Sequence, residues 1–378
     1  MNKQEAKELL QNNLDFLQSL NVPEYILYRK WTHMNTNSMK NWFFQNKNKI
    51  EKVKNKIWIP RDNYDYLNLN IDVIPANTKE LLLQWRILRE MTHSAVWHSS
   101  PGRMARFIVV NKTKERTLLG SYQDSYEYLG IISLGSDFIG IGGRDKVIGW
   151  EKEHKMKYER LKYTAMGSSI SPTQPLGYNY LGGKLVALMV CSDKVENFWN
   201  SKYKEPLSGI TTTSLFGGYS QYNRLKYWKK CKSSEGKVKL EPTEDIYEQL
   251  KEWYKEEFPE DYEKTLKGSH PKARLLGKIY KELSIKTYEN NAPRGVYWCP
   301  LYTNTNSFLR CESEKLGEKL FNNDVESLSD LWKDKYATKR IKKLEQENNV
   351  SNDRLFYDDL IDKDWEEVRS KYIINIGR

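Results

Sequence analysis

Residues 161–218 read LKYTAMGSSISPTQPLGYNYLGGKLVALMVCSDKVENFWNSKYKEPLSGITTTSLFGG, and they contain the clearest indication of the fold class. Its first part, up to Pro172, has the pattern of a β-strand, and residues 175–203 then change to helical periodicity. The stretch 208–218 is rich in threonine, which favours a second strand, and the glycine pair at its end marks the end of that strand. A strand, a helix and a strand in this order predict a sheet with a helix packed on it.

Two further apolar runs precede this unit. FIVV at 107–110 and YLGIISLG at 128–135 predict strands, whereas FIGIGGRDKVIGW at 138–150 predicts a loop. The resulting order β–β–β–α–β predicts a mixed sheet in an α/β (α+β) fold.

Helical periodicity covers both flanks of these strands. It occurs at residues 3–20, 40–56, 78–91, 243–266, 270–290 and 327–348, with a short strand-and-turn element at 294–310. We therefore expect three parts: a helical, basic N-terminal region at 1–80, the α/β core at 81–240, and a helical C-terminal region at 241–378.

The composition excludes some broad classes of protein. With 39% hydrophobic and 29% charged residues, the chain is neither disordered nor membrane-embedded. No apolar run approaches the roughly 18 residues of a membrane-spanning helix, and the start lacks a signal-peptide centre, so we expect a cytoplasmic protein. The net charge of +11 favours anionic partners. Four cysteines without CxxC spacing argue against a cysteine-rich zinc site, and no particular metal is indicated.

A cluster of small and polar residues lies where the strand at 161–172 gives way to the helix. It consists of Gln174, Gly177, Gly182, Gly183 and Lys184. Small residues at such a junction let backbone N–H groups approach a phosphate, and the helix N-terminus favours an anion. The spacing matches neither GxxxxGK[ST] nor GxGxxG. The glycines therefore form either a cofactor-binding turn or a close contact between helix and sheet.

Two other groups of residues are candidates for catalysis. His93 and His98 lie in MTHSAVWHSSPGR, before the first core strand. Histidine side chains can transfer protons near neutral pH or bind metals, and a purely structural role is the competing interpretation. Asp145 follows Arg144 in GGRDKVIGW, where the pair either makes local turn contacts or orients a substrate.

A basic segment follows the strand at 208–218. From Gln221 to Leu240, seven Lys or Arg residues accompany one Glu, which gives a net charge of +6. A basic patch beside a polar strand end predicts nucleic-acid contacts. We expect these contacts from Arg224, Lys226, Lys229 and Lys230. The lysine-rich stretch 40–56 is either a solvated helical face or a nucleic-acid arm.

Gln174-x-x-Gly177 at a strand-to-helix turn, followed by a strand and then Tyr222, resembles the coenzyme-A-binding half of GNAT acyltransferases. That family holds acyl-coenzyme A between splayed central strands, with its pyrophosphate on this turn. The resemblance implies a GNAT-like mixed central sheet and an acyl-coenzyme A-like donor, held by the cluster from Gln174 to Lys184.

Four blocks in order also resemble the DruA family, named after the A component of the Druantia anti-phage defence system. They are GGRDKVIGW at 142–150, YNYLGGKLVALMVCSDKV at 178–195, ITTTSLFGGYSQYNRL at 210–225 and RGVYWCPLYTNTNSFLR at 294–310. The resemblance covers residues 85–340 and implies a role in phage–host conflict, with DNA as the target. A more distant similarity, to Mom-type phage DNA modification proteins with a GNAT-like fold, implies catalytic roles for His93, His98 and Tyr222.

Three hypotheses follow from these patterns. The first is a GNAT-like protein that modifies or recognises DNA, with His93, His98, Asp145 and Tyr222 at the reaction centre and the four cations on the DNA backbone. The second is a non-catalytic DNA-binding component that recruits protein partners of a defence system through the C-terminal helices. The third is a nuclease, although no PD-(D/E)xK, HNH or DDE spacing occurs.

Overall fold

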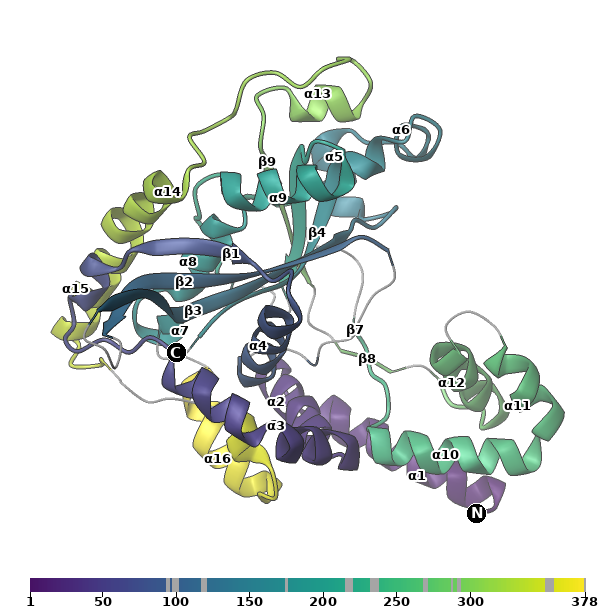
Figure 1. Cartoon of the computed structure of the whole chain (residues 1–378). Helices are drawn as coiled ribbons and strands as arrows, with labels where there is room; N and C mark the ends of the chain where they lie inside the picture. Colours follow the sequence, from purple (N-terminus) through teal and green to yellow (C-terminus); the bar gives the residue numbers. More distant parts are fainter. Residues whose placement is uncertain are drawn as a thin grey trace.

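A seven-stranded mixed sheet forms the centre of the computed structural model of the chain (Figure 1). The structure describes residues 1–92, 96, 102–116, 121–173, 176–214, 220–231, 238–267, 271–286, 288–290, 294–350 and 357–376. The strands of the sheet are β1 (Ile71–Pro75), β2 (Met104–Arg116), β3 (Tyr122–Ser136), β4 (Thr164–Pro172), β5 (Gly209–Ser214), β6 (Lys229–Cys231) and β9 (Gly295–Pro300). Two short strands, β7 (Val238–Lys239) and β8 (Glu289–Asn290), pair separately.

The order of the strands in the sheet is β1-β2-β3-β4-β5-β9-β6. Only β4 and β5 run parallel, and all the other neighbours are antiparallel. A parallel pair needs a crossover, which the helical residues between β4 and β5 provide. The predictions of a mixed sheet and of the order β–β–β–α–β are therefore confirmed. The sheet also takes strands from outside residues 81–240, namely β1 and β9.

Alternating side chains of the strands build two cores, one on each face of the sheet. On β2, Phe107 and Val109 belong to one core, while Ile108 and Val110 belong to the other. The first core receives α8 (Gly182–Met189), α9 (Asp193–Tyr203) and α14 (Val325–Trp332). The second receives α2 (Val22–Met34), α3 (Asn37–Asn55), α4 (Lys79–Met91) and α16 (Trp365–Ile376).

A third core lies away from the sheet and joins the N-terminal helix to a later part of the chain. Here α1 (Lys3–Ser19) packs against α10 (Glu244–Glu257), α11 (Pro259–Leu266) and α12 (Pro271–Glu282) (Figure 1). The helical pattern of α1 buries Leu10, Leu14 and Leu17. Among the described helices, none has the length and apolar character needed to cross a lipid bilayer.

Two expectations from the sequence differ from the structure. The predicted loop at 138–150 contains the helix α5 (Gly142–Ile148), so this prediction was wrong. Its glycines sit at the first turn, where helical propensity matters least, and Gly149 ends the helix with φ +71°. The single helix expected at 175–203 is divided into α7 (Leu176–Asn179), α8 and α9.

Candidate functional site

The parallel strands β4 and β5 separate in the middle of the sheet. Their pairing runs from Thr164–Gly209 to Gly167–Thr212 and ends there. Beyond this point β4 stays paired with β3 up to Pro172, and β5 stays paired with β9 up to Ser214. The sheet is therefore open between the C-terminal ends of its two central strands, the edge at which open α/β sheets bind ligands.

The side chains of Gln221 and Tyr222 lie at this opening. Gln221 Nε2 donates to the carbonyl of Ile170 on β4 at 2.9 Å and to the Tyr222 hydroxyl at 3.0 Å. Tyr222 is 6% exposed, and its ring lies 5.0 Å from that of Tyr297. Burial raises the pKa of Tyr222 to about 12, and hydrogen bonds from Thr212 and Gln221 oppose this shift. The hydroxyl is therefore protonated at neutral pH.

The predicted glycine turn lies directly beside these side chains. Gly182 and Gly183 begin α8, and a methyl group at Gly183 would lie 2.4 Å from the Gln221 Oε1. Lys184 Nζ donates to the backbone carbonyls of Gln221 at 3.0 Å and Asn223 at 2.6 Å. Burial, together with the nearby Arg224 charge, lowers the pKa of Lys184 to about 8. Lys184 thus fastens residues 221–223 onto the start of α8.

This arrangement does not fit the pyrophosphate of an acyl-coenzyme A-like donor. The space over Gly183 is filled by Gln221, and a methyl group at Gly182 would lie 2.5 Å from the side chain of Leu176. Lys184 is engaged by protein carbonyls. Gly177 is in α7, where its N–H donates to Thr173. Gly182 and Gly183 therefore serve close packing, and Gln174 lies outside the described residues.

The four cations predicted to contact nucleic acid follow Asn223 directly in the chain, within residues 224–230. Arg224, Lys226, Lys229 and Lys230 are all exposed. Arg224 has a φ of +57°, a left-handed conformation that is unusual for a residue with a side chain. Tyr336, far along the chain, accepts the Lys226 N–H at 2.9 Å and donates to the Arg224 carbonyl at 3.3 Å. The basic segment is therefore fixed at both ends of a strained turn.

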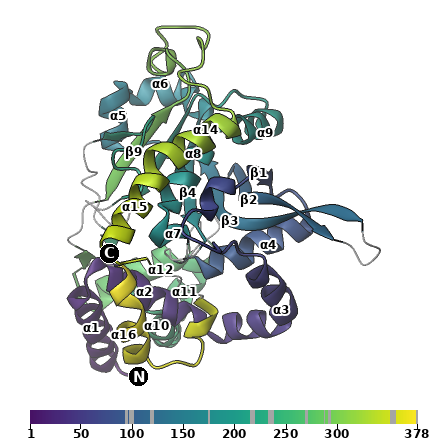
Figure 2. The same ribbon diagram turned by 90° about the vertical axis from the view of Figure 1, so that its left-hand side faces the viewer.

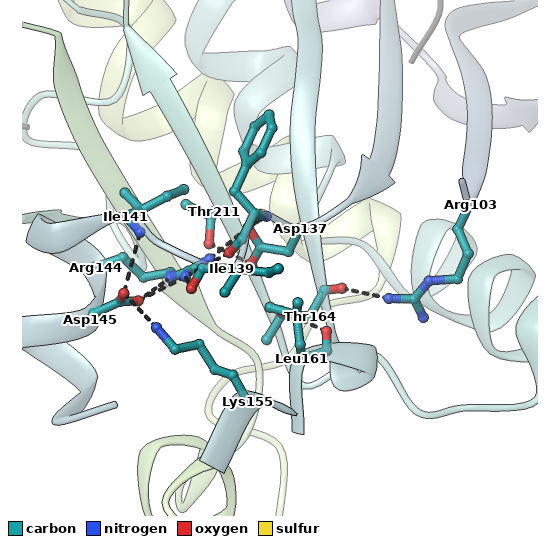
Figure 3. Close-up of polar contacts among 11 residues, drawn as sticks. Arg103, Asp137, Ile139, Ile141, Arg144, Asp145, Lys155, Leu161, Thr164 and Thr211 are labelled. Carbon is teal, nitrogen blue, oxygen red and sulfur yellow. Dashed lines mark hydrogen bonds and ion pairs between the residues drawn. The ribbon is translucent and has the colours of Figure 1, made fainter. Parts of the chain in front are cut away.

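Asp145 lies in a separate, buried charge network (Figure 3). Its carboxylate binds Arg144 Nη2 at 2.7 Å and Lys155 Nζ at 2.6 Å. Arg144 also pairs with Asp137 at 2.7 Å, and both side chains are fully buried. Thr211 on β5 donates to Asp137 at 3.0 Å. The network connects α5 to the end of β3 and to β5.

Asp145 and Tyr222 are on opposite faces of the sheet. Thr211 contacts the Asp137 network, whereas its neighbour Thr212 bonds to Tyr222, and successive residues of a strand point to opposite faces. The structure therefore brings Tyr222 together with Gly182, Gly183 and Lys184, but not with Asp145. His93 and His98 lie outside the described residues.

The lysine-rich helix α3 contributes to a different concave surface. A groove of about 1050 Å³ runs between α3, α4 and β3. Its lining contains four lysines and three acidic residues, namely Lys49, Lys52, Lys56, Lys79, Glu80, Glu115 and Asp124. Because its charges nearly balance, this groove is less suited to binding a polyanion than the basic segment 224–230 is.

Three residues of these two regions were not predicted as functional. Gln221, Asp137 and Tyr336 act through contacts with residues distant in the chain, and no local pattern marks such contacts. The left-handed conformation of Arg224 is likewise not predictable from the local sequence. Within the described residues, no group of three or more His, Cys, Asp and Glu side chains is placed to hold a metal ion.

Comparison with known proteins adds evidence of a different kind. A family model described as Druantia protein DruA matches residues 21–311. Druantia protein DruA of Escherichia coli (strain UMEA 4076-1) is 28% identical over 151 residues, which cover 37% of this chain and 34% of that protein. The aligned part is thus about a third of the relative's length. No solved structure matches the chain, so the GNAT-like core stays a prediction.

Proposed function

The chain belongs to the family of Druantia protein DruA, and we propose that it is a DNA-binding component of an anti-phage defence system. The observation that carries the binding part of this proposal is the segment 224–230, whose four cations are exposed. It holds four cations and no acidic residue, and Tyr336 binds its backbone at Arg224 and Lys226. Defence as the biological setting comes from the family name alone.

The physical basis of the proposal is the release of counterions. Arg224, Lys226, Lys229 and Lys230 form no ion pair with a described residue, so their charges are available to phosphates. Each lysine or arginine that meets a phosphate releases condensed cations from the DNA, which favours binding at low salt. Contacts of this kind position DNA without reading its sequence.

The direct test is the salt dependence of DNA binding. Fluorescence anisotropy of a labelled 20-base-pair duplex would be measured with the wild-type chain and with the Lys229→Gln/Lys230→Gln variant. A matched control is Lys3→Gln/Lys7→Gln, which removes two exposed lysines from α1. We expect the first pair alone to weaken binding and to reduce the slope of log K against log salt by about 2.

A competing role for these lysines is protection of an exposed sheet edge. Lys229 and Lys230 lie on β6, the last strand of the sheet, and lysines on edge strands prevent pairing with other chains. In that case the Lys229→Gln/Lys230→Gln variant would keep its DNA affinity and aggregate at lower concentration. This result would contradict DNA binding by the segment.

A second candidate function is the modification of DNA bases. The separation of β4 from β5 beside Tyr222 favours it, because that arrangement resembles the splayed strands of GNAT proteins. Intact-mass analysis of oligonucleotides incubated with the protein in cell extract tests it. The oligonucleotide should gain mass only in extract that contains the protein. If the Tyr222→Phe variant still adds this mass, Tyr222 is not the catalytic group. If the wild-type protein adds no mass, DNA modification is excluded.

A further inference from the structure

A second basic segment lies at residues 333–343, far from the first along the chain. It reads KDKYATKRIKK and contains six cations and one acidic residue, a net charge of +5. Its first half is a π-helical turn, Lys333–Ala337, between α14 and α15 (Thr338–Gln346). Turns of this kind are rare and frequently mark functional sites.

The lysines of α15 face solvent on one side of the helix. Ile341 and Leu344 are buried and hold the helix against the rest of the fold. Lys339, Lys342 and Lys343 are exposed, and residues three or four apart on a helix lie on the same face. The helix therefore presents a row of positive charge rather than an even distribution. Figure 2 shows α14 and α15 along the front of the molecule.

Tyr336 joins this segment to the basic segment after β5. Its hydroxyl binds the backbone of both Arg224 and Lys226, and its ring lies 5.3 Å from Lys184 Nζ. Lys335 is the residue before Tyr336 and is exposed. We call the combined set the joint basic surface; its members are Arg224, Lys226, Lys230, Lys335, Lys339, Lys342 and Lys343. Lys229 is not a member, because it alternates with Lys230 along β6 and lies on the Asp145 side of the sheet.

The charges of this surface are not neutralised within the described part of the chain. Of its seven members, only Lys343 pairs with a carboxylate of the described residues, that of Glu347 at 3.6 Å. Elsewhere some exposed lysines pair closely, as Lys157 does with Glu153 at 2.9 Å. Uncompensated like charges repel one another, so their retention on one surface indicates an external polyanion.

We propose that the joint basic surface binds the phosphate backbone of duplex DNA. The inference deepens the proposed function, on which it rests, by adding α15 to the interface. The nine residues of α15 extend the surface by about 13 Å, a length over which a duplex carries about eight phosphates.

The aromatic residues of the surface decide between duplex and single strand. Proteins that hold single strands stack bases on exposed aromatic rings. Here Tyr336 and Trp228 are buried, and the half-buried Tyr227 is already stacked on Phe321 at 3.7 Å. The surface therefore offers charge without a stacking platform, which suits a duplex.

The test compares two pairs of lysines on the same probe. Anisotropy of the labelled 20-base-pair duplex at 50–200 mM salt would be measured for Lys339→Gln/Lys342→Gln and for the α1 control pair. We expect the α15 variant to bind up to about 60-fold more weakly at 0.1 M salt, from two lost phosphate contacts, with a slope reduced by about 2. Lys339→Arg/Lys342→Arg should bind as the wild type does, because the charge remains.

Several results would overturn this inference. If the α15 variant binds like wild type while Lys229→Gln/Lys230→Gln binds weakly, the joint basic surface is wrong and the proposed function stands. If neither pair changes binding, both fail. If a labelled single-stranded 20-mer binds more tightly than the duplex, the assignment of the surface to duplex DNA is wrong. An effect of the α15 pair on phosphatidylserine vesicles, and none on DNA, would assign the surface to a membrane instead.

Discussion

Replacement of Asp145 by alanine tests whether this residue is structural or catalytic. The carboxylate holds Lys155 at 2.6 Å and Arg144 at 2.7 Å, and it accepts the Ile141 N–H at 3.2 Å. Without it, Arg144 keeps Asp137, but the Lys155 ammonium, only 5% exposed, has no carboxylate partner among the described residues. Leaving one buried charge unpaired costs about 3–5 kcal/mol, so we expect a loss of stability of that size.

The assay is urea unfolding followed by tryptophan fluorescence. Trp150, one of the 12 tryptophans that contribute to this signal, lies 4.9 Å from the Arg144 guanidinium. Lys155→Met supplies the matched control, because it removes the charge that Asp145→Ala would strand. We expect the double variant to lose at least about 1 kcal/mol less than the sum of the single variants, as coupled neighbours do.

The functional comparison decides the interpretation. If Asp145 is structural, DNA binding and phage protection should fall only as far as the folded fraction falls. If Asp145→Ala unfolds within about 0.5 kcal/mol of wild type and yet abolishes protection, the structural role is refuted and the catalytic prediction gains support.

Three further outcomes are expected from the core. Gly209→Ala should destabilise the fold by about 1–3 kcal/mol in urea unfolding, because its methyl group would lie 2.1 Å from the buried Trp298 ring; an unchanged midpoint would contradict this. Burial lowers the pKa of Lys30 to about 8, so the unfolded chain binds more protons between about pH 8 and 10.5, and the unfolding free energy should rise with pH in that window. The rise should be smaller in Lys30→Met, which keeps only the contribution of Lys184 from these two lysines. Iodoacetamide should modify the exposed Cys311 in the native protein and the three buried cysteines only in urea, as peptide mass mapping would report.

Much of the fold was predictable because its patterns are local. The helices at 3–20, 40–56 and 78–91 show their buried stripe directly in the sequence, and Thr78 caps the third of them. The strands at 107–110 and 128–135 are apolar on both sides because helices cover both faces of the sheet. The predicted DruA relationship is confirmed by the family match.

The remainder depends on contacts between distant residues. The helix α5 was predicted as a loop because Gly142 and Gly143 disfavour helices, and the ion pair of Arg144 with Asp137 that anchors it is not visible in a local window. The joint basic surface was missed for a similar reason. Lysines at helical spacing also occur on ordinary solvated helices, and only the hydrogen bonds of Tyr336 reveal their proximity to Arg224.

The strand order also has a consequence for synthesis. The β5 strand is paired on its outer side only by β9, and the 80 residues between Ser214 and Gly295 must be translated before β9 exists. At about 5–20 residues per second, the nascent chain carries an unpaired central edge for about 4–16 s. During this time the backbone of β5 can pair with any other extended chain. We therefore expect ribosome-bound chains that end before residue 295 to bind chaperones, and chains that include β9 to release them.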